Sequence, residues 1–373
     1  MAGRCWPFRH QVVTMFSVPT FNPNHLVRSR HSLLSEGWSS SRIDRSLAAG
    51  KLLRLHDGVY FDAAQAASIT TTERWLATLA GHCQRDPGRV IVSHRSAAVL
   101  HGFDGFNHLA GFDMTTPRYD HRPTDVLGLP IDVRAPFSSG VCRAPAIRSR
   151  FFDDLETAMV YSLPVTGIAQ TLADIGRFAS VDLVEAAVES ALRAVPPARP
   201  DMWNTGLLHE LNELAKVQDH QRSTAALRHV LRRRGDCRPT GSYPETVLVQ
   251  ALRPFGVELV RQPTIRILSP QGIVEATLFP DLVDLDRVAS AEVEGMEGHS
   301  SAQQLEHDAD RTNLLSSALT VRRFAARAVL RNPPDVARSI AVWLNQLPVR
   351  PPSWFTPFAT VVRTSEGLDI IRR

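Results

Sequence analysis

The sequence predicts a multidomain protein that combines α+β and α/β domains, and three observations support this prediction. The chain has 373 residues, which is enough for two or three domains. Residues 20–62 have the pattern of two helices followed by two short strands. Residues 240–347 alternate strand-like runs with helical patterns. Hydrophobic residues make up 43% of the chain and charged residues 21%, values that indicate a soluble globular protein.

The first domain is predicted at residues 20–62, after a flexible N-terminus over residues 1–19. The pattern predicts one helix over residues 25–36, ended by Gly37, and a second over residues 42–49, ended by Gly50. The serines at 39–41 supply N-cap hydroxyls for the second helix. Strands are predicted at 51–55 and 59–61, joined by a tight turn. Helix, turn, helix and a two-stranded ribbon is the plan of a winged helix.

The rest of the chain divides at changes of composition. Residues 63–194 mix helical patterns with short strands, which predicts a mixed α/β middle domain. Residues 195–239 are a linker and polar helices, which include the run Arg232-Arg233-Arg234, predicted as a solvated helix end. Residues 240–347 follow as the last domain. One strand is expected there over residues 257–267, and the Pro-rich tail at 348–373 is expected to be peripheral.

Composition limits the class of protein and its surroundings. The four cysteines lie far apart without a C-x-x-C pair, which argues against a zinc knuckle or a disulfide scaffold. No run approaches the roughly 18 apolar residues of a membrane helix, and the first residues lack the features of a signal peptide. We therefore expect a cytoplasmic protein without a membrane partner. The net charge of +4 favours nucleic acid weakly. Only Lys51 and Lys216 are lysines, so almost none is available for catalysis.

Acidic residues dominate the chemistry of the last domain. Glu292 and Glu294 are two apart in a predicted strand, so both side chains lie on one face. Asp281 follows Pro280 near another strand and could join them. Carboxylates this close repel one another unless a cation lies between them, and oxygen ligands suit Mg²⁺ or Mn²⁺. The alternative is that the pair is simply the solvated face of an edge strand.

The N-terminal module carries residues suited to DNA. Its second helix presents Ser40, Ser41, Arg42 and Arg45, and its ribbon presents Lys51 and Arg54. Hydroxyls and backbone amides at a helix start suit phosphates, and arginine can bind guanine edges. These residues predict contact with double-stranded DNA. The alternative is that they are solvated residues of a module that docks a protein.

The last domain resembles the very-short-patch-repair (Vsr) endonucleases of the PD-(D/E)XK superfamily, over residues 240–347. The resemblance is carried by Ser-Tyr-Pro-Glu with Glu245, by Pro280-Asp281, and by Glu292-Val-Glu-Gly eleven residues further on. It also includes Asp308 and Arg311, which we expect to form a structural ion pair. It implies a restriction-endonuclease-like fold, which is a central mixed sheet flanked by helices.

The same resemblance assigns roles to residues. Asp281 and Glu292 would bind Mg²⁺ or Mn²⁺, and Glu245 would complete the metal shell. His299 would act on the attacking water or the leaving group. Glu294 stands where the superfamily has a lysine, so activation of water must come from elsewhere or not occur.

The N-terminal half resembles AbiEi-type antitoxins of type IV toxin–antitoxin systems. The segment Gly50-Lys-Leu-Leu-Arg-Leu-His-Asp-Gly-Val-Tyr60 carries the resemblance most clearly, and residues 93–102 and 164–176 are similar to the domain that follows in that family. The resemblance implies an AbiEi-like winged helix, a function in toxin–antitoxin pairing or phage defence, and a cognate toxin as partner.

Three functions remain open from the sequence. The first is a DNA-binding protein with a metal-dependent endonuclease domain. The second is a non-catalytic transcriptional regulator or antitoxin that keeps a degenerate nuclease fold. The third is a protein–protein adaptor. The sequence predicts neither the oligomeric state nor the DNA sequence that is bound.

Overall fold

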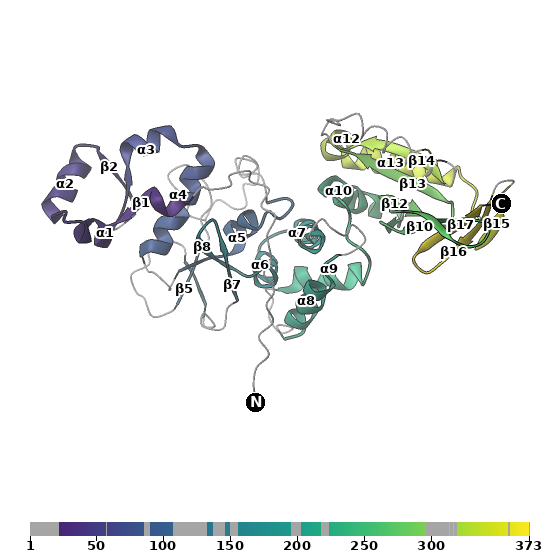
Figure 1. Cartoon of the computed structure of the whole chain (residues 1–373), viewed down its shortest axis with the longest axis horizontal. Coiled ribbons are helices and arrows are strands. Elements are labelled where there is room, and N and C mark those ends of the chain that lie inside the picture. The colour runs from purple at the N-terminus through teal and green to yellow at the C-terminus, as the bar shows by residue number, and fades with distance from the viewer. Residues whose placement is uncertain are drawn as a thin grey trace. The chain divides into compact units, whose positions relative to one another are not determined.

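The computed structural model divides the chain into two compact units (Figure 1). Unit 1 comprises Met1–Val188 with Gly206–Val230, and unit 2 comprises Glu189–Thr205 with Leu231–Arg373. Both contain helices and sheets, in agreement with the predicted mixture of α and β structure. No helix in the described residues is long and apolar enough to cross a membrane. The described residues are 22–56, 58–85, 90–106, 133–136, 146–149, 156–194, 203–217, 224–295, 313, 316, 319–356 and 359–372.

Unit 1 begins with a three-stranded antiparallel sheet and two short helices, drawn in purple in Figure 1. The second helix starts after Ser39, whose hydroxyl accepts a hydrogen bond from the Arg42 amide over 3.2 Å. It ends before Gly50, which has a φ of +66°, and the Lys51 amide donates to Ser46 O, which completes a Schellman motif. The elements are η1 (Pro23–His25), β1 (Val27–Ser29), α1 (Arg30–Ser35), α2 (Ser40–Ala48), β2 (Leu52–His56) and β3 (Val59–Asp62), with strand order β1-β3-β2.

The predicted helix over residues 25–36 is wrong in its first part. Residues 27–29 form β1, which pairs antiparallel with β3, so that Val27 lies opposite Phe61. Both side chains are buried. Pairing with a strand that lies far along the chain outweighs the local helical pattern, and only α1 remains helical.

The remainder of unit 1 contains helices and a second sheet. α4 (Thr71–Arg85), which follows α3 (Ala63–Ser68), packs against all three strands of the first sheet. The second sheet has the order β6-β5-β4-β8-β7 and mixes parallel with antiparallel pairs. Its strands are β4 (Ile91–Val92), β5 (Val133–Pro136), β6 (Ala146–Ser149), β7 (Thr157–Val160) and β8 (Leu163–Thr166), accompanied by α5 (His94–Leu100) and α6 (Ile168–Ile175). The next helices are α7 (Val181–Arg193), α8 (Thr205–Val217) and α9 (Ala225–Arg234), and the last residues of α7 and α9 belong to unit 2.

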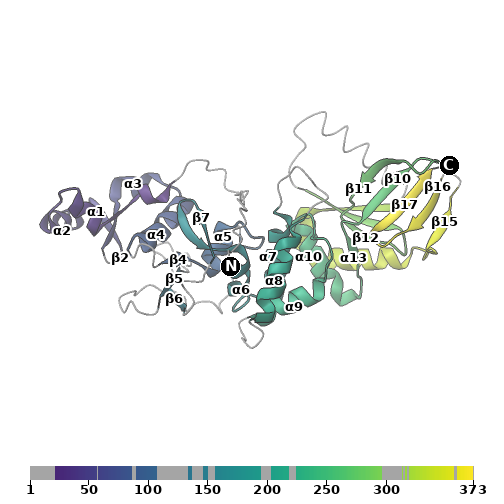
Figure 2. The ribbon, with the colours of Figure 1, turned by 60° about the horizontal axis from the view of Figure 1, so that its bottom comes forward.

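In the described residues, unit 2 contains two sheets and helices that pack on them, and Figure 2 shows the strands of the second sheet beside α10 (Tyr243–Leu252) and α13 (Pro333–Asn345). α10, α12 (Ala326–Arg331) and α13 pack on one face of the first sheet, around Ala289 and Ala291. Val283 and Val288, from β12 and the turn after it, pack against the second sheet. The first sheet has the order β14-β13-β12-β9, with β9 (Val260–Arg261), β12 (Leu282–Asp284), β13 (Ala289–Glu294) and β14 (Thr320–Ala325).

The second sheet of unit 2 corrects the prediction for the C-terminal tail. Residues 353–372 form three of its five strands, and β17 pairs in parallel with β10 at its centre. Leu368 is fully buried in the core of unit 2. The tail is therefore not peripheral. The order is β11-β10-β17-β16-β15, with η5 (Arg253–Phe255) preceding β9 and with β10 (Thr264–Leu268), β11 (Val274–Leu278), β15 (Ser353–Phe355), β16 (Ala359–Arg363) and β17 (Gly367–Arg372).

The predicted single strand over residues 257–267 is two strands in different sheets. β9 ends at Arg261 and β10 starts at Thr264. Between them Gln262 has a φ of +45°, and Pro263 has no amide hydrogen for a sheet. The chain therefore changes direction at Gln262, and the side chain of this residue lies beside Glu245 and Asp281.

A buried ionic cluster corrects the prediction for Arg232-Arg233-Arg234. Arg232 and Arg233 are exposed, but Arg234 is 1% exposed. Its Nε donates to Glu189 Oε1 over 3.2 Å, and Arg261 Nη1 donates to the same oxygen over 2.8 Å. The backbone amide of Thr240 donates to Glu189 Oε2 over 3.0 Å. The end of α9 is thus part of the interior of unit 2.

Candidate functional site

Four polar side chains come together at one end of the first sheet of unit 2. They are Glu245 from α10, Gln262 after β9, Asp281 before β12, and Glu292 on β13. We call this group the carboxylate site. It lies where β12 starts, so that the antiparallel pairing of β12 with β13 determines its geometry.

The hairpin of β12 and β13 positions Asp281 against Glu292. Leu282 lies opposite Ala291 in the register, so the residues that flank this pair are neighbours. The amide of Asp281 donates to Glu292 Oε1 over 3.2 Å, and the amide of Val293 donates to Asp281 Oδ2 over 2.8 Å. Each carboxylate is therefore held by a backbone amide from the other strand. Such bonds fix the direction of a charged side chain.

Gln262 connects this pair with the helix. Its Nε2 lies 3.1 Å from Glu245 Oε2 and 3.4 Å from Asp281 Oδ1. Its backbone amide donates to Asp281 O over 2.9 Å. Sequence reasoning missed this residue. The available signal was a polar residue before Pro263, in the interruption between two apolar runs.

Glu245 is positioned by the start of α10. The Ser242 hydroxyl caps the helix and donates to Glu245 Oε1 over 2.7 Å, and the Gly241 amide donates to Oε2 over 2.6 Å. Glu245 is 4% exposed, and this burial raises the pKa of its carboxyl, although the hydrogen bonds from Ser242, Gly241 and Gln262 oppose the shift. Glu245 is thus a buried carboxyl that binds several donors.

Gly241 allows the close approach of these groups. A Cβ at this position would lie 2.8 Å from Gln262 Nε2 and 3.0 Å from Glu245 Oε1. Any side chain here would displace one of the two. Glycine here therefore allows Gln262 and Glu245 to keep the positions in which they contact one another.

Glu294 lies apart from this group in its contacts. Glu292 and Glu294 are on the same face of β13, as expected, but Glu294 is exposed and forms an ion pair with Arg323 Nη1 over 3.0 Å. Arg323 is on β14, where it lies opposite Glu292 in the parallel register. Position 294 thus carries a carboxylate paired with an arginine. His299, Asp308 and Arg311 lie outside the described residues.

The donor atoms of the carboxylate site fit a divalent ion only in part. Across the described residues, no group of three or more His, Cys, Asp or Glu side chains is arranged so that it could hold a metal ion. Asp281 and Glu292 offer two carboxylates, and Mg²⁺ is usually bound by one or two carboxylates together with water and phosphate oxygens. The fit therefore depends on ligands supplied by water and substrate.

The six residues expected to contact DNA are all exposed on unit 1. Ser40, Ser41, Arg42 and Arg45 are on α2, Lys51 follows this helix, and Arg54 is on β2. Two of the arginines are held in place: Arg45 Nε donates to Ser41 O over 3.2 Å, and the Arg42 guanidinium lies 3.9 Å from the centre of the Trp38 ring.

Trp38 organises the surface beside α2. It lies in the connection between α1 and α2, and the guanidinium of Arg28 is 5.2 Å from its ring centre. Arg28 also forms an ion pair with Glu36. Two arginines therefore contact one aromatic ring, an arrangement that fixes planar cations at a surface. The sequence pattern did not indicate this role for Trp38.

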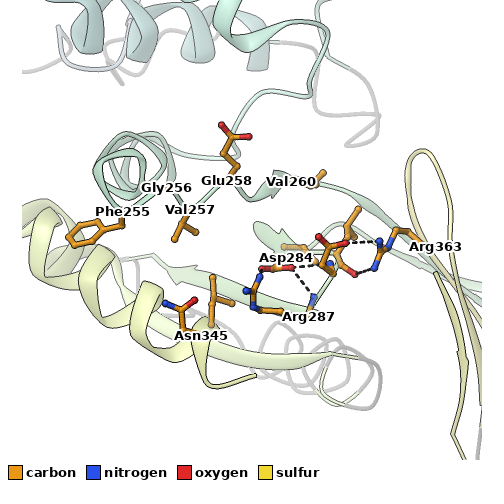
Figure 3. Close-up of a pocket in the computed structure, with 13 residues that line it drawn as sticks. Phe255, Gly256, Val257, Glu258, Val260, Asp284, Arg287, Asn345 and Arg363 are labelled. Atoms are coloured by element: carbon orange, nitrogen blue, oxygen red, sulfur yellow. Dashed lines mark hydrogen bonds and ion pairs between the residues drawn. The ribbon is translucent and has the colours of Figure 1, made fainter. Parts of the chain in front are cut away.

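A cavity of about 510 Å³ in unit 2 is a second possible site (Figure 3). It lies at the other end of β12, where Asp284 binds Arg287 over 2.9 Å and Asp286 binds Arg363 over 2.6 Å. Both arginines of the lining are engaged by neighbouring aspartates, as the dashed lines in Figure 3 show. The cavity thus offers fewer available charges than its composition suggests, and it contains none of the residues predicted from the sequence.

Comparison with known proteins adds no assignment. The chain matches no protein-family model and no curated protein.

Proposed function

We propose that the chain is a DNA-binding protein whose second unit hydrolyses phosphodiester bonds with the help of Mg²⁺ or Mn²⁺. The sheet and helices of residues 27–62 would act as a winged helix on double-stranded DNA, and unit 2 would be a nuclease domain of the PD-(D/E)XK type. The sequence resemblances to AbiEi-type antitoxins and Vsr endonucleases support both assignments.

The observation that carries the proposal is the juxtaposition of Asp281 and Glu292. They are eleven residues apart, and each is oriented by an amide of the opposite strand. Paired carboxylates cost free energy through repulsion, and a bound cation removes that cost. A hairpin with a purely structural role would not need two carboxylates here, because a neutral polar side chain could replace either of them.

The residues of the carboxylate site would have different roles in hydrolysis. Asp281 and Glu292 would hold the metal, and Gln262 would orient Asp281 by donating to its Oδ1. Glu245 would fix Gln262 from the start of α10. A divalent ion bound there would lower the pKa of a bound water and neutralise charge on the phosphate.

Arg323 would supply the positive charge that the resemblance assigns to a lysine. It pairs with Glu294, which stands at that lysine position, and it lies opposite Glu292. Arginine stays protonated in proteins, so it could stabilise the charge of the phosphate but could not remove a proton from water. Water activation would then depend on the metal alone.

Cleavage of DNA by the purified full-length chain tests the proposal. Supercoiled and linear DNA would be incubated with Mg²⁺, Mn²⁺ or EDTA. We expect metal-dependent nicking that Asp281→Ala abolishes while DNA binding is kept. Glu275→Gln, which changes an exposed carboxylate on β11, is the matched control and should cleave normally. Normal cleavage by Asp281→Ala would disprove the mechanism.

The ion pair of Glu294 with Arg323 also favours a second function. A site that has replaced its lysine by a salt-bridged glutamate could have lost catalysis while it kept the fold. The protein would then be a transcriptional regulator or antitoxin that pairs with a toxin. This function predicts sequence-selective, salt-sensitive DNA binding without cleavage in any divalent metal. Metal-dependent cleavage that Asp281→Ala abolishes would exclude it.

A further inference from the structure

Four arginines follow one another along β14 and α12. No acidic residue occurs between positions 319 and 331, so the four arginines are the only charged residues of this stretch of the sequence. All four arginines are exposed. We call them the β14–α12 arginines: Arg322, Arg323, Arg327 and Arg331.

Two of these arginines contact neighbouring side chains. Arg322 lies 5.3 Å from the centre of the Trp343 ring, and Arg323 pairs with Glu294. Arg327 and Arg331 differ, because among the described residues no ion pair or hydrogen bond of their side chains is present. They are four residues apart and therefore on the same side of α12.

The opposite side of α12 is fixed in the core. Ala326 and Val329 are buried, and Val329 packs in the cluster that includes Leu248 of α10. Arg327 and Arg331 therefore face away from the protein. The helix thus places these two arginines, which have no ion pair among the described residues, one turn apart on its exposed side.

The β14–α12 arginines start beside the carboxylate site. Arg323 is opposite Glu292 in the register, and α12 begins directly after β14. A carboxylate site repels a polyanion, so a protein that brings DNA to it needs positive charge nearby. The β14–α12 arginines are positively charged and start beside the carboxylate site, so they could attract DNA to it.

We propose that the β14–α12 arginines bind the phosphate backbone of duplex DNA, with Arg327 and Arg331 as the two direct phosphate contacts. This inference rests on the proposed function, because it assumes that the polyanion which reaches the carboxylate site is DNA. It assigns unit 2 a DNA-binding surface of its own, separate from the residues of α2. Acidic lipid is the other polyanion that such a surface could meet, and the experiment distinguishes the two.

Salt-dependent binding of the full-length chain tests the proposal. Arg42→Ala/Arg45→Ala serves as the background, because it removes the arginines of α2. Affinity for a short fluorescein-labelled duplex would be measured by anisotropy over a KCl series, with EDTA to prevent cleavage. Each phosphate contact contributes about 1 to the slope of log Kd against log salt concentration. We expect Arg327→Gln/Arg331→Gln to lower the slope by about 2.

Two control variants make the result specific. Arg327→Lys/Arg331→Lys keeps both charges, so its slope should equal that of the background. Arg372→Gln removes an exposed arginine of β17 that pairs with Glu275, and it should also leave the slope unchanged. The proposal would be overturned if the slope is unchanged in Arg327→Gln/Arg331→Gln, or if either control variant lowers the slope by the same amount as this variant. Binding of the background to acidic vesicles, with no binding to the duplex, would also overturn it.

The outcome can be separated from that of the proposed hydrolase function. If wild type does not cleave DNA but the glutamine variant lowers the slope, the hydrolase function fails and the DNA surface stands. If wild type cleaves and the slope is unchanged, the surface fails and the hydrolase function stands.

Discussion

Replacing Glu189 by alanine should destabilise unit 2 strongly. The carboxylate of Glu189 is fully buried and binds three donors: Arg234 Nε, Arg261 Nη1 and the amide of Thr240. The side chain of Arg234 is also completely buried, whereas that of Arg261 is 11% exposed. Alanine would remove the carboxylate that binds all three donors, and Arg234 would keep only its contacts with neutral groups, the carbonyls of Gly235 and Cys237 and the Trp203 ring, among the described residues.

The size of the effect follows from this geometry. Removal of one partner of a buried ion pair costs about 3–5 kcal/mol, because the other charge stays buried. The Thr240 amide would lose its acceptor as well, which costs about 1 kcal/mol or more. Arg261 can reach water, so its loss adds little. We expect the free energy of unfolding to fall by about 5 kcal/mol, and the midpoint of thermal unfolding by roughly 15 °C.

Calorimetry and urea unfolding of the full-length chain measure the effect. The loss of stability should appear in the unfolding transition of unit 2, because Glu189, Arg234 and Arg261 all lie within that unit. Glu189→Met/Arg234→Met, which removes both charges, is the matched variant and should be less destabilising than Glu189→Ala. A loss below about 1 kcal/mol in Glu189→Ala would refute the argument that this carboxylate compensates the buried guanidinium.

Three further predictions concern single residues. Burial raises the pKa of Glu245 above its unfolded value, so the free energy of unfolding should fall as pH rises through that titration, and Glu245→Gln should flatten this decline in a pH series of urea unfolding. Arg42→Lys keeps the charge but loses the planar contact with Trp38, so affinity for duplex DNA should fall about fivefold in fluorescence anisotropy. Gly367→Ala would place a Cβ 2.2 Å from Thr264 O, so urea unfolding should show a loss of about 2 kcal/mol.

Each of these predictions has a matched comparison. For Glu245 the comparison is Glu275→Gln, an exposed carboxylate, which should leave the pH dependence of stability unchanged. For Arg42 it is Arg45→Lys, because no aromatic contact of Arg45 is present in the described residues. For Gly367 it is Gly295→Ala, where nothing lies within 4 Å of the added Cβ. If a comparison variant changes the measured quantity (the pH dependence of stability, the DNA affinity or the free energy of unfolding) as much as the variant it is compared with, the physical reason given for that prediction is contradicted.

Local features of the fold could be predicted because short-range interactions determine them. Ser39 and Gly50 mark the ends of α2 through capping and a positive φ. Ser242 marks the start of α10 in the same way. The same-face placement of Glu292 and Glu294 follows from the period of a strand alone. These features need only residues within a few positions of one another.

The carboxylate site was predictable in part. Asp281 and Glu292 were expected together from their strands, and their hydrogen bonds agree with this expectation. The sequence also grouped Glu294 with them, but the parallel pairing of β13 with β14 brings Arg323 to Glu294 instead. Gln262 was missed because its role depends on a change of chain direction between two sheets. A side chain's partner across a sheet is set by register, which local sequence does not encode.

The sequence by itself determined the mixed α and β character, the ends of α2, and the residues from which a site could be built. Tertiary structure alone decided that Arg234 is buried against Glu189, that residues 353–372 complete a sheet, and that Gln262 joins the carboxylates. The physical reason is distance along the chain. Capping and strand period act over a few residues, whereas burial of a charge and insertion of a strand depend on partners that lie tens of residues away and meet only when the core forms.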